Sequence, residues 1–259
     1  MQPHIIPFVN YCERGANAAF WAEPLNAITN GGFLLAALAG MVMIARRPSH
    51  ERSFWHMFFV ADFIAIGIGS FLFHTMPSKG TELADIGPIG VFMLTYLVYA
   101  LRHFVRAPWS ITLAGIAVFI GAMVMSFNVK CWDGEIGMNL DIPAGARAEC
   151  MNGSLGYGPA LVAMVLISGW LAFKRHPAAS LQIAAAAAFI VSLTFRSLDQ
   201  RLCGEWVILG HHLGTHFLWH LLNSLTLFLL LVAAVKYGGS GQEVLPPRPK
   251  ATRPVYEVS

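Results

Sequence analysis

The chain has 259 residues, of which 56% are hydrophobic and 12% are charged, and its formal net charge is +3. An ordinary soluble domain carries about 25% charged residues, so the composition argues against one and is typical of a membrane protein. The basic residues are scattered between apolar runs and form no single stripe with aromatic residues, which argues against nucleic-acid binding.

Seven apolar runs are long enough to cross the roughly 30 Å hydrocarbon layer of a bilayer as helices. In chain order they are Leu25–Ile44, Phe54–Met76, Ala84–Leu101, Trp109–Asn128, Gly156–Phe173, Ala178–Phe195 and Val207–Val235. Unpaired backbone groups are not tolerated in lipid, and the runs lack the alternation of barrel strands, so helices are the expected spanning structure. The predicted fold class is all-α, a seven-transmembrane helical bundle formed by residues 1–237.

The segment that follows, residues 238–259, is rich in Gly, Pro and charged residues. Such a composition cannot build a packed core. We expect it to be a disordered cytoplasmic tail.

The basic residues are divided unequally between the two sides of this bundle. One side holds eleven of the seventeen: Arg46, Arg47, Arg52, Arg102, Arg106, Lys174, Arg175, Lys236, Arg248, Lys250 and Arg253. The other side holds Arg14, Lys79, Lys130, Arg147, Arg196 and Arg201. The positive-inside rule then predicts an N-terminus outside and a C-terminus in the cytoplasm. The Arg- and Ala-rich composition favours a bacterial inner membrane over a eukaryotic endomembrane.

All four cysteines fall on the non-cytoplasmic side, where disulfides are permitted. Four cysteines allow three connectivities, and four free thiols are a further alternative. We favour Cys131–Cys150, which would close the loop between the fourth and fifth helices. The other pair, Cys12–Cys203, would tie the N-terminal segment to the sixth loop.

Ionisable residues in membrane helices are costly and are candidate functional groups. Here they are Asp62, His74, Asp85, His211, His212, His216 and His220. In the predicted topology His74, Asp85, His216 and His220 meet at the outer leaflet. We expect His211 and His212 to lie near the interface, and Asp62 lies deeper, without a role beyond a buried hydrogen bond.

His216 and His220 are four residues apart, so one helix face presents both imidazoles. Hydrogen-bonded packing is the alternative for such a pair, and His74 at matching depth favours a metal site. Three imidazoles and a water are typical of catalytic zinc, which lowers the pKa of its water to about 7 and polarises a carbonyl. Hydrolysis of an amide or an ester is the expected chemistry.

Two further residues lie beside this predicted zinc site. Ser70 is one turn from His74 and can stabilise an oxyanion, although a small residue here also permits close helix packing. Asp85 can act as a general base or orient a histidine, although it can also be a charge favoured by the helix dipole.

These residues resemble the motifs of alkaline ceramidases: Gly69-Ser70-Phe71-Leu72-Phe73-His74, Asp85 and His216-Phe217-Leu218-Trp219-His220. Tyr11-Cys12-Glu13, Glu23-Pro24-Leu25-Asn26 and Asp199-Gln200-Arg201-Leu202-Cys203 are also similar to that family. The resemblance implies a zinc-dependent membrane amidase that cleaves ceramide or a related lipid into a fatty acid and a sphingoid base. In it His74, His216 and His220 hold zinc, Asp85 activates the water, Ser70 stabilises the tetrahedral intermediate, and Cys12 pairs with Cys203.

The same resemblance implies a calcium site near the N-terminus. Glu13 and Glu23 match its acids, whereas Asn10 stands where an Asp is expected and Gly15 where an Asn is, and Tyr11 is the remaining candidate. The chain also departs from the family after Asp85, where Ile86-Gly87-Pro88-Ile89 follows.

The motifs leave other functions open. They include hydrolysis of another acyl lipid, a haem protein with histidine ligands on paired helices, and a receptor or transporter with a structural site. The expected partners are a lipid substrate and membrane lipids, and no obligate protein partner is evident.

Overall fold

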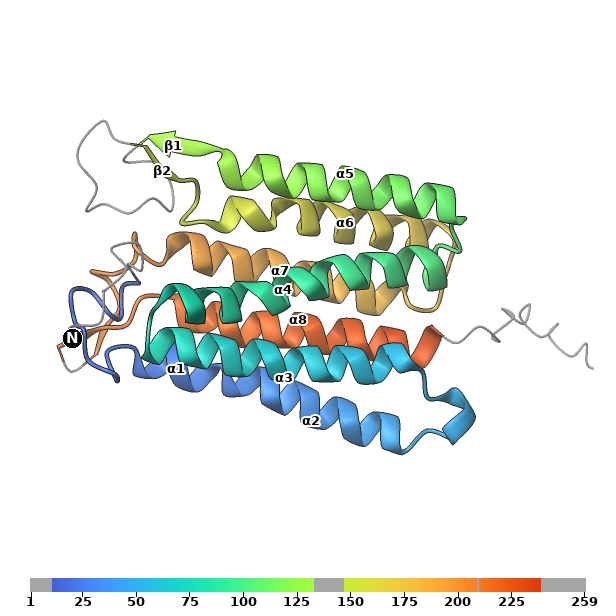
Figure 1. Cartoon of the computed structure of the whole chain (residues 1–259), viewed down its shortest axis with the longest axis horizontal. Helices are drawn as coiled ribbons and strands as arrows, with labels where there is room; N and C mark the ends of the chain where they lie inside the picture. The colour runs from blue at the N-terminus through green and yellow to red at the C-terminus, as the bar shows by residue number, and fades with distance from the viewer. Residues whose placement is uncertain (1–10, 133–146, 209, 239–259) are drawn as a thin grey trace, which may run out of the picture.

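A computed structural model describes residues 11–132, 147–208 and 210–238 (Figure 1). Its α-helices are α1 (Pro24–Thr29), α2 (Gly31–Ala45), α3 (Phe54–Thr75), α4 (Lys79–Tyr99), α5 (Trp109–Asn128), α6 (Gly158–Phe173), α7 (Ala179–Leu198) and α8 (His216–Tyr237). Short 3-10 helices cover Ser49–Glu51 and Ser154–Tyr157, and a π-helix over Ala100–Phe104 continues α4. Two small antiparallel hairpins pair β1 (Lys130–Trp132) with β2 (Arg147–Glu149) and β3 (Val207–Ile208) with β4 (His211–His212).

Seven helical spans in the described residues are long and apolar enough to cross a membrane, which confirms the predicted fold class. They are Pro24–Ala45, Phe54–Thr75, Lys79–Phe104, Trp109–Asn128, Ser154–Phe173, Ala179–Leu198 and His216–Tyr237. The protein is therefore an integral multi-pass membrane protein. The predicted disorder of the tail concerns residues that, from 239 on, lie outside the described part of the chain.

Two helix boundaries differ from the predictions. The seventh helix does not start at Val207, because Val207–Ile208 pairs with His211–His212 and α8 begins at His216. The third span starts earlier than Ala84, since a capping box between Ser78 and Thr81 begins α4 at Lys79. Asp85 therefore lies beyond the first turn, where the helix dipole has faded, and it needs another explanation.

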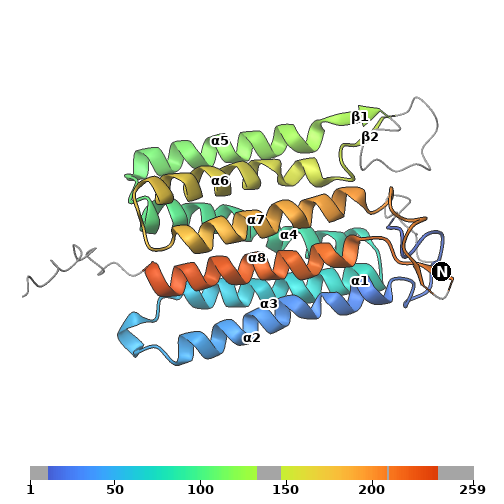
Figure 2. The ribbon, with the colours of Figure 1, turned by 180° about the vertical axis from the view of Figure 1, so that it is seen from behind.

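The helix α8 lies at the centre of the bundle. Both views show it between α3 and α7, with α2 beyond α3 and with α5 and α6 at the far edge (Figures 1 and 2). The main apolar core joins side chains of α2, α3, α4 and α8, among them Phe33, Phe59, Phe63 and Leu231. In contrast, α5 buries few of its side chains, as expected for a helix whose surface faces lipid.

The N-terminal segment and both hairpins gather at one end of the bundle, which we call the disulfide end (Figure 1). Disulfides join Cys12 to Cys203 and Cys131 to Cys150, which is the connectivity favoured from the sequence. The turns between α2 and α3, α4 and α5, and α6 and α7 lie at the opposite end, together with the end of α8.

Candidate active site

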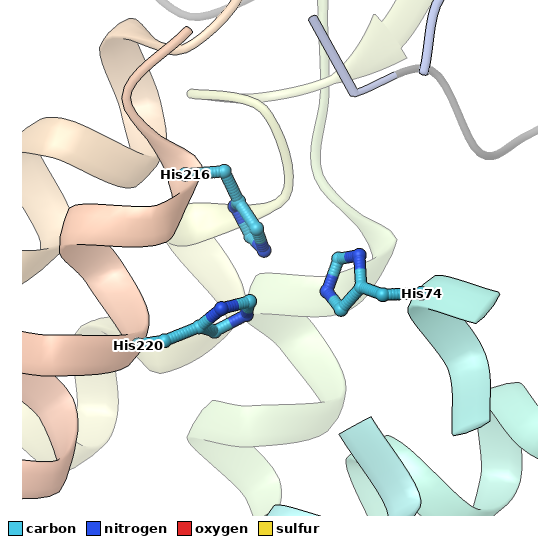
Figure 3. Close-up of side chains that lie close together, drawn as sticks. All are labelled: His74, His216 and His220. Atoms are coloured by element: carbon cyan, nitrogen blue, oxygen red, sulfur yellow. The ribbon is translucent and has the colours of Figure 1, made fainter. Parts of the chain in front are cut away.

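Three histidines meet at the disulfide end of the bundle. His74 is in the last turn of α3, His216 opens α8, and His220 lies one turn further along α8. Their ring centroids are 4.7 to 5.2 Å apart, and one ring nitrogen from each lies within 4.8 Å of the others. The side chains point toward a common centre (Figure 3) and are almost fully buried, with exposed fractions of 1%, 2% and 1%.

Hydrogen bonds orient two of the rings. Nδ1 of His74 lies 2.5 Å from Oε2 of Glu23, a carboxylate oxygen that accepts the Nδ1 proton. Nδ1 of His220 lies 3.0 Å from the hydroxyl of Thr29. Because that hydroxyl already donates its hydrogen to Leu25 O at 2.6 Å, it accepts from His220. With Nδ1 engaged in this way, Nε2 is the nitrogen of each ring that can offer a lone pair to a metal ion.

His216 is held by its backbone and by an aromatic neighbour. Its N–H donates to Oδ1 of Asp199 at 2.9 Å, and the N–H of Thr215 donates to the same oxygen at 2.7 Å. The Tyr11 ring lies against the imidazole with centroids 4.1 Å apart. Burial raises the pKa of Asp199 against the opposing effect of these backbone donors. The N-terminus of α8 is thus fixed by one carboxylate.

The three histidines fit a metal site. Among the described residues, Nε2 of His74 and Nδ1 of His216 are buried and have no hydrogen-bond partner. A buried polar nitrogen without a partner is costly, and a metal ion removes that cost by accepting the lone pair. The cluster therefore can hold a metal ion.

Ser70 and Asp85 lie beside the histidines and are themselves buried. The Ser70 hydroxyl lies close to the Asp85 carboxylate, which also interacts electrostatically with His74. Helices α3 and α4 lie so close together here that a Cβ atom on Gly69 would collide with the carbonyl of Ala84. Pro88 has no N–H to bond that carbonyl within α4. The departure from the family pattern after Asp85 thus coincides with this tight contact between α3 and α4.

Arg196 also lies at the site, although its position in the sequence predicted only a loop residue. It lies in the last turn of α7, with its guanidinium 5.4 Å from the Tyr157 ring and 5.5 Å from the Trp219 ring. It also lies close enough to Tyr11 and Asp85 to interact electrostatically with both. A charged residue directly following the apolar run of a membrane helix is the signal that could have identified it.

The remaining ionisable candidates lie away from the histidines. His211 and His212 are exposed in β4, and their position near the membrane interface stays a prediction. Asp62 precedes His74 by twelve residues, or about 18 Å of helix. It is buried, and its Oδ2 has no partner among the described residues.

A family model described as Ceramidase matches residues 8–243. The chain belongs to the Ceramidase family. It is accordingly a ceramidase-like amide hydrolase of the membrane with a ceramide-like lipid substrate. Comparisons with curated proteins and with solved structures each return no match.

In the described part of the chain, the two acids expected to bind calcium, Glu13 and Glu23, are already engaged by other partners. Both Glu13 oxygens accept backbone N–H groups at the start of α1, from Leu25 at 2.7 Å and Asn26 at 2.8 Å. Glu23 accepts from Asn26, His74 and the guanidinium of Arg14. Burial raises the pKa of Glu13 despite its two backbone donors. Burial acts in the same direction on Glu23, but His74, Asn26 and Arg14 outweigh it and lower the pKa of Glu23.

Of the other three calcium candidates, the two that the structure describes add no side-chain carboxylate or amide oxygen to this set. Tyr11 turns its ring toward His74 and His216. Gly15 has no side chain and occupies a left-handed turn at φ 51°. Asn10 lies outside the described residues.

A cavity of the helical bundle lies next to the histidine site. Ile66, Ile89 and Asn223 line it, each about one turn from Ser70, Asp85 or His220 on the same helix. Its wall is otherwise mostly apolar, with Phe92 and Met93 among its members. The cavity extends from the site toward the opposite end of the bundle, as an acyl chain requires.

Proposed function

We propose that this protein is a zinc-dependent amidase that hydrolyses the N-acyl bond of ceramide or a related lipid to a fatty acid and a sphingoid base. His74, His216 and His220 would hold the zinc ion. A bound zinc ion would lower the pKa of the attacking water and polarise the substrate carbonyl. The observation that carries this proposal is the convergence of three buried, oriented histidines on a point flanked by Asp85 and Ser70.

Asp85 acts as the general base. Its carboxylate accepts a proton from the attacking water and later passes it to the amine nitrogen as the C–N bond breaks. Before the reaction the nearby Ser70 hydroxyl would donate to this carboxylate. Once Asp85 is protonated it is a weaker acceptor, and the Ser70 hydroxyl can donate to the developing oxyanion of the substrate instead.

The cavity supports a substrate with a long acyl chain. The amide carbonyl would lie among Ser70, Asp85 and the histidines, with the chain extending past Ile66, Ile89 and Phe92. An acyl ester would fit the same apolar wall, so the headgroup and the amide nitrogen must supply the preference for ceramide.

The site faces the outer leaflet of a bacterial inner membrane in our proposal. Two of the basic residues at the disulfide end make contacts within the site: Arg14 pairs with Glu23, and Arg196 lies over the Tyr157 ring. The opposite end carries Arg46, Arg47, Arg52, Arg102, Arg106, Lys174, Arg175 and Lys236. This asymmetry supports a cytoplasmic location of the opposite end.

The test is metal content and fatty-acid release from a panel of ceramides and acyl esters. We expect the wild type to bind about one zinc ion per chain and to cleave ceramides in preference to esters. His216→Ala should lose zinc and turnover, whereas His50→Ala, which changes an exposed histidine, should lose neither. Asp85→Asn should retain zinc and lose roughly 10²- to 10⁴-fold in turnover. A wild type without zinc, or without activity on the panel, would contradict the proposal.

A further inference from the structure

We infer that the guanidinium of Arg14 is a built-in cation that takes the place of a calcium ion beside the histidine site. It positions Glu23 and, through Glu23, the ring of His74. The consequence is a ceramidase that binds no calcium here and needs none. The positioning role rests on the proposed function of His74 as a metal ligand.

The contacts of Arg14 resemble those of a bound cation. Its Nε pairs with Oε1 of Glu23, its Nη2 donates to His74 O at 2.7 Å, and its Nη1 donates to Asn17 O at 3.1 Å. A carboxylate and backbone carbonyls are the oxygen ligands that calcium prefers. Here a planar guanidinium with several N–H donors satisfies these oxygens.

The buried charges of Arg14 and Glu23 also favour a guanidinium over a calcium ion at this position. Arg14 and Glu23 have exposed fractions of only 5% and 0%. A buried carboxylate requires a nearby positive charge, and arginine supplies one permanently because it does not lose its proton in proteins. A divalent cation at the same carboxylate would be repelled by the guanidinium. Glu13 is the other acid nearby, and each of its oxygens already accepts a backbone N–H group of α1.

Arg14 restrains His74 at two points. Its Nη2 holds the backbone carbonyl of His74, and its Nε holds one oxygen of Glu23. The other oxygen of Glu23 accepts from Nδ1 of His74 at 2.5 Å and from Asn26 Nδ2 at 3.0 Å. The ring and the backbone of His74 are thus both fixed relative to one guanidinium. Arg14 acts through other residues and is a positioning residue.

Metal analysis of the purified protein tests the inference. The wild type would be prepared in calcium-containing buffer, and its calcium and zinc contents measured. The zinc affinity would then be compared for wild type, Arg14→Gln, Arg14→Lys and the control Arg47→Gln, which removes an arginine from an exposed pair with Glu51. Each variant would be measured with and without millimolar calcium chloride.

We expect wild type to retain no stoichiometric calcium and to show a zinc affinity unaffected by added calcium. Arg14→Gln should bind zinc about tenfold more weakly, the lower end for loss of an outer-shell partner, and added calcium should restore part of that affinity by replacing the missing charge. Arg47→Gln should match the wild type. Arg14→Lys keeps the positive charge but not the planar guanidinium, so its zinc affinity should lie between those of Arg14→Gln and the wild type. Arg14→Lys replaces Arg14→Gln in the comparison if Arg14→Gln does not fold.

Stoichiometric calcium in the wild type would overturn the inference, as would an Arg14→Gln protein with unchanged zinc affinity. The calcium content does not depend on zinc or on turnover. A wild type without zinc and without hydrolysis would therefore contradict the proposed function, while its calcium content would still decide whether Arg14 replaces the ion.

Discussion

Thr29 shows how one hydroxyl group can determine the chemistry of a histidine. It accepts a hydrogen bond from Nδ1 of His220 because its own hydrogen is donated to Leu25 O. This contact selects the tautomer whose Nε2 is free for a metal. Glu23 does the same for His74 with a carboxylate. The orientation of both rings is therefore set by residues in or directly before α1.

Thr29→Val should weaken zinc binding, because valine keeps the shape of threonine but cannot accept the Nδ1 proton. We expect roughly a tenfold loss of zinc affinity, in the range seen for outer-shell partners, measured by competition with a zinc chelator. Thr95→Val is the matched control, since that half-buried hydroxyl bonds carbonyls of its own helix, Val91 O and Phe92 O. Equal affinities in the two variants would disprove the role of Thr29.

The contact between α3 and α4 is the element on which the pairing of Ser70 with Asp85 depends. A side chain at Gly69 would meet the backbone of Ala84 and Asp85, with the Asp85 N only 3.1 Å from a Cβ atom. Backbone atoms cannot rotate away as a flexible side chain can. The absence of a side chain at Gly69 therefore allows the two helices to bring Ser70 and Asp85 together.

Gly69→Ala should force α3 and α4 apart. The expected cost is about 1–3 kcal/mol of stability, the usual range for overpacking, together with a fall in kcat as Ser70 and Asp85 separate. Thermal unfolding in detergent and single-substrate kinetics would measure the two effects. Gly90→Ala in α4 should show neither, because a Cβ there meets open space. A Gly69→Ala protein as stable and active as Gly90→Ala would rule out the packing argument.

At the scale of the whole molecule, the Cys12–Cys203 disulfide joins the N-terminal segment to the connection between α7 and α8 across 191 residues of sequence. Asp199 supports the same junction, since its Oδ2 accepts from the N–H of Cys12 at 3.0 Å and its Oδ1 from that of His216. At this junction the Tyr11 ring contacts the rings of His74 and His216. The Cys131–Cys150 disulfide instead closes a chain separation of 19 residues near β1 and β2.

Replacing both Cys12 and Cys203 with serine should therefore destabilise the protein and weaken its metal site. We expect a loss of about 2–5 kcal/mol in unfolding experiments, with a fall in zinc affinity. The double replacement of Cys131 and Cys150 should leave zinc affinity unchanged. If both double variants bind zinc as the wild type does, the first disulfide has no role at the site.

The orientation of the bundle in the membrane is a prediction from its charges. With the basic opposite end in the cytoplasm, a fluorescent protein fused after Ser259 should fluoresce in bacteria, and an alkaline phosphatase fused there should be inactive. The converse pattern would reverse the topology and move the active site to the cytoplasmic leaflet.

The features that depend on local composition and spacing could be predicted from the sequence. Seven apolar runs predict seven helices because lipid leaves the backbone no other partner than itself. The His216–His220 spacing aligns two ligands because both lie on one helix. Local patterns failed at Val207–Ile208, where an apolar pair forms a hairpin strand instead of the start of α8, because short apolar runs do not distinguish helix from strand.

The tertiary structure alone decided which distant residues meet. Arg14 and Glu23 are nine residues apart and His74 is a further fifty-one away, yet hydrogen bonds connect all three. Thr29 hydrogen-bonds His220, 191 residues away in the sequence. Arg196, predicted to be a loop residue, packs its guanidinium against the rings of Tyr157 and Trp219. Such pairings follow from how helices pack and from the need of each buried polar group for a partner, and neither is a property of any one segment of sequence.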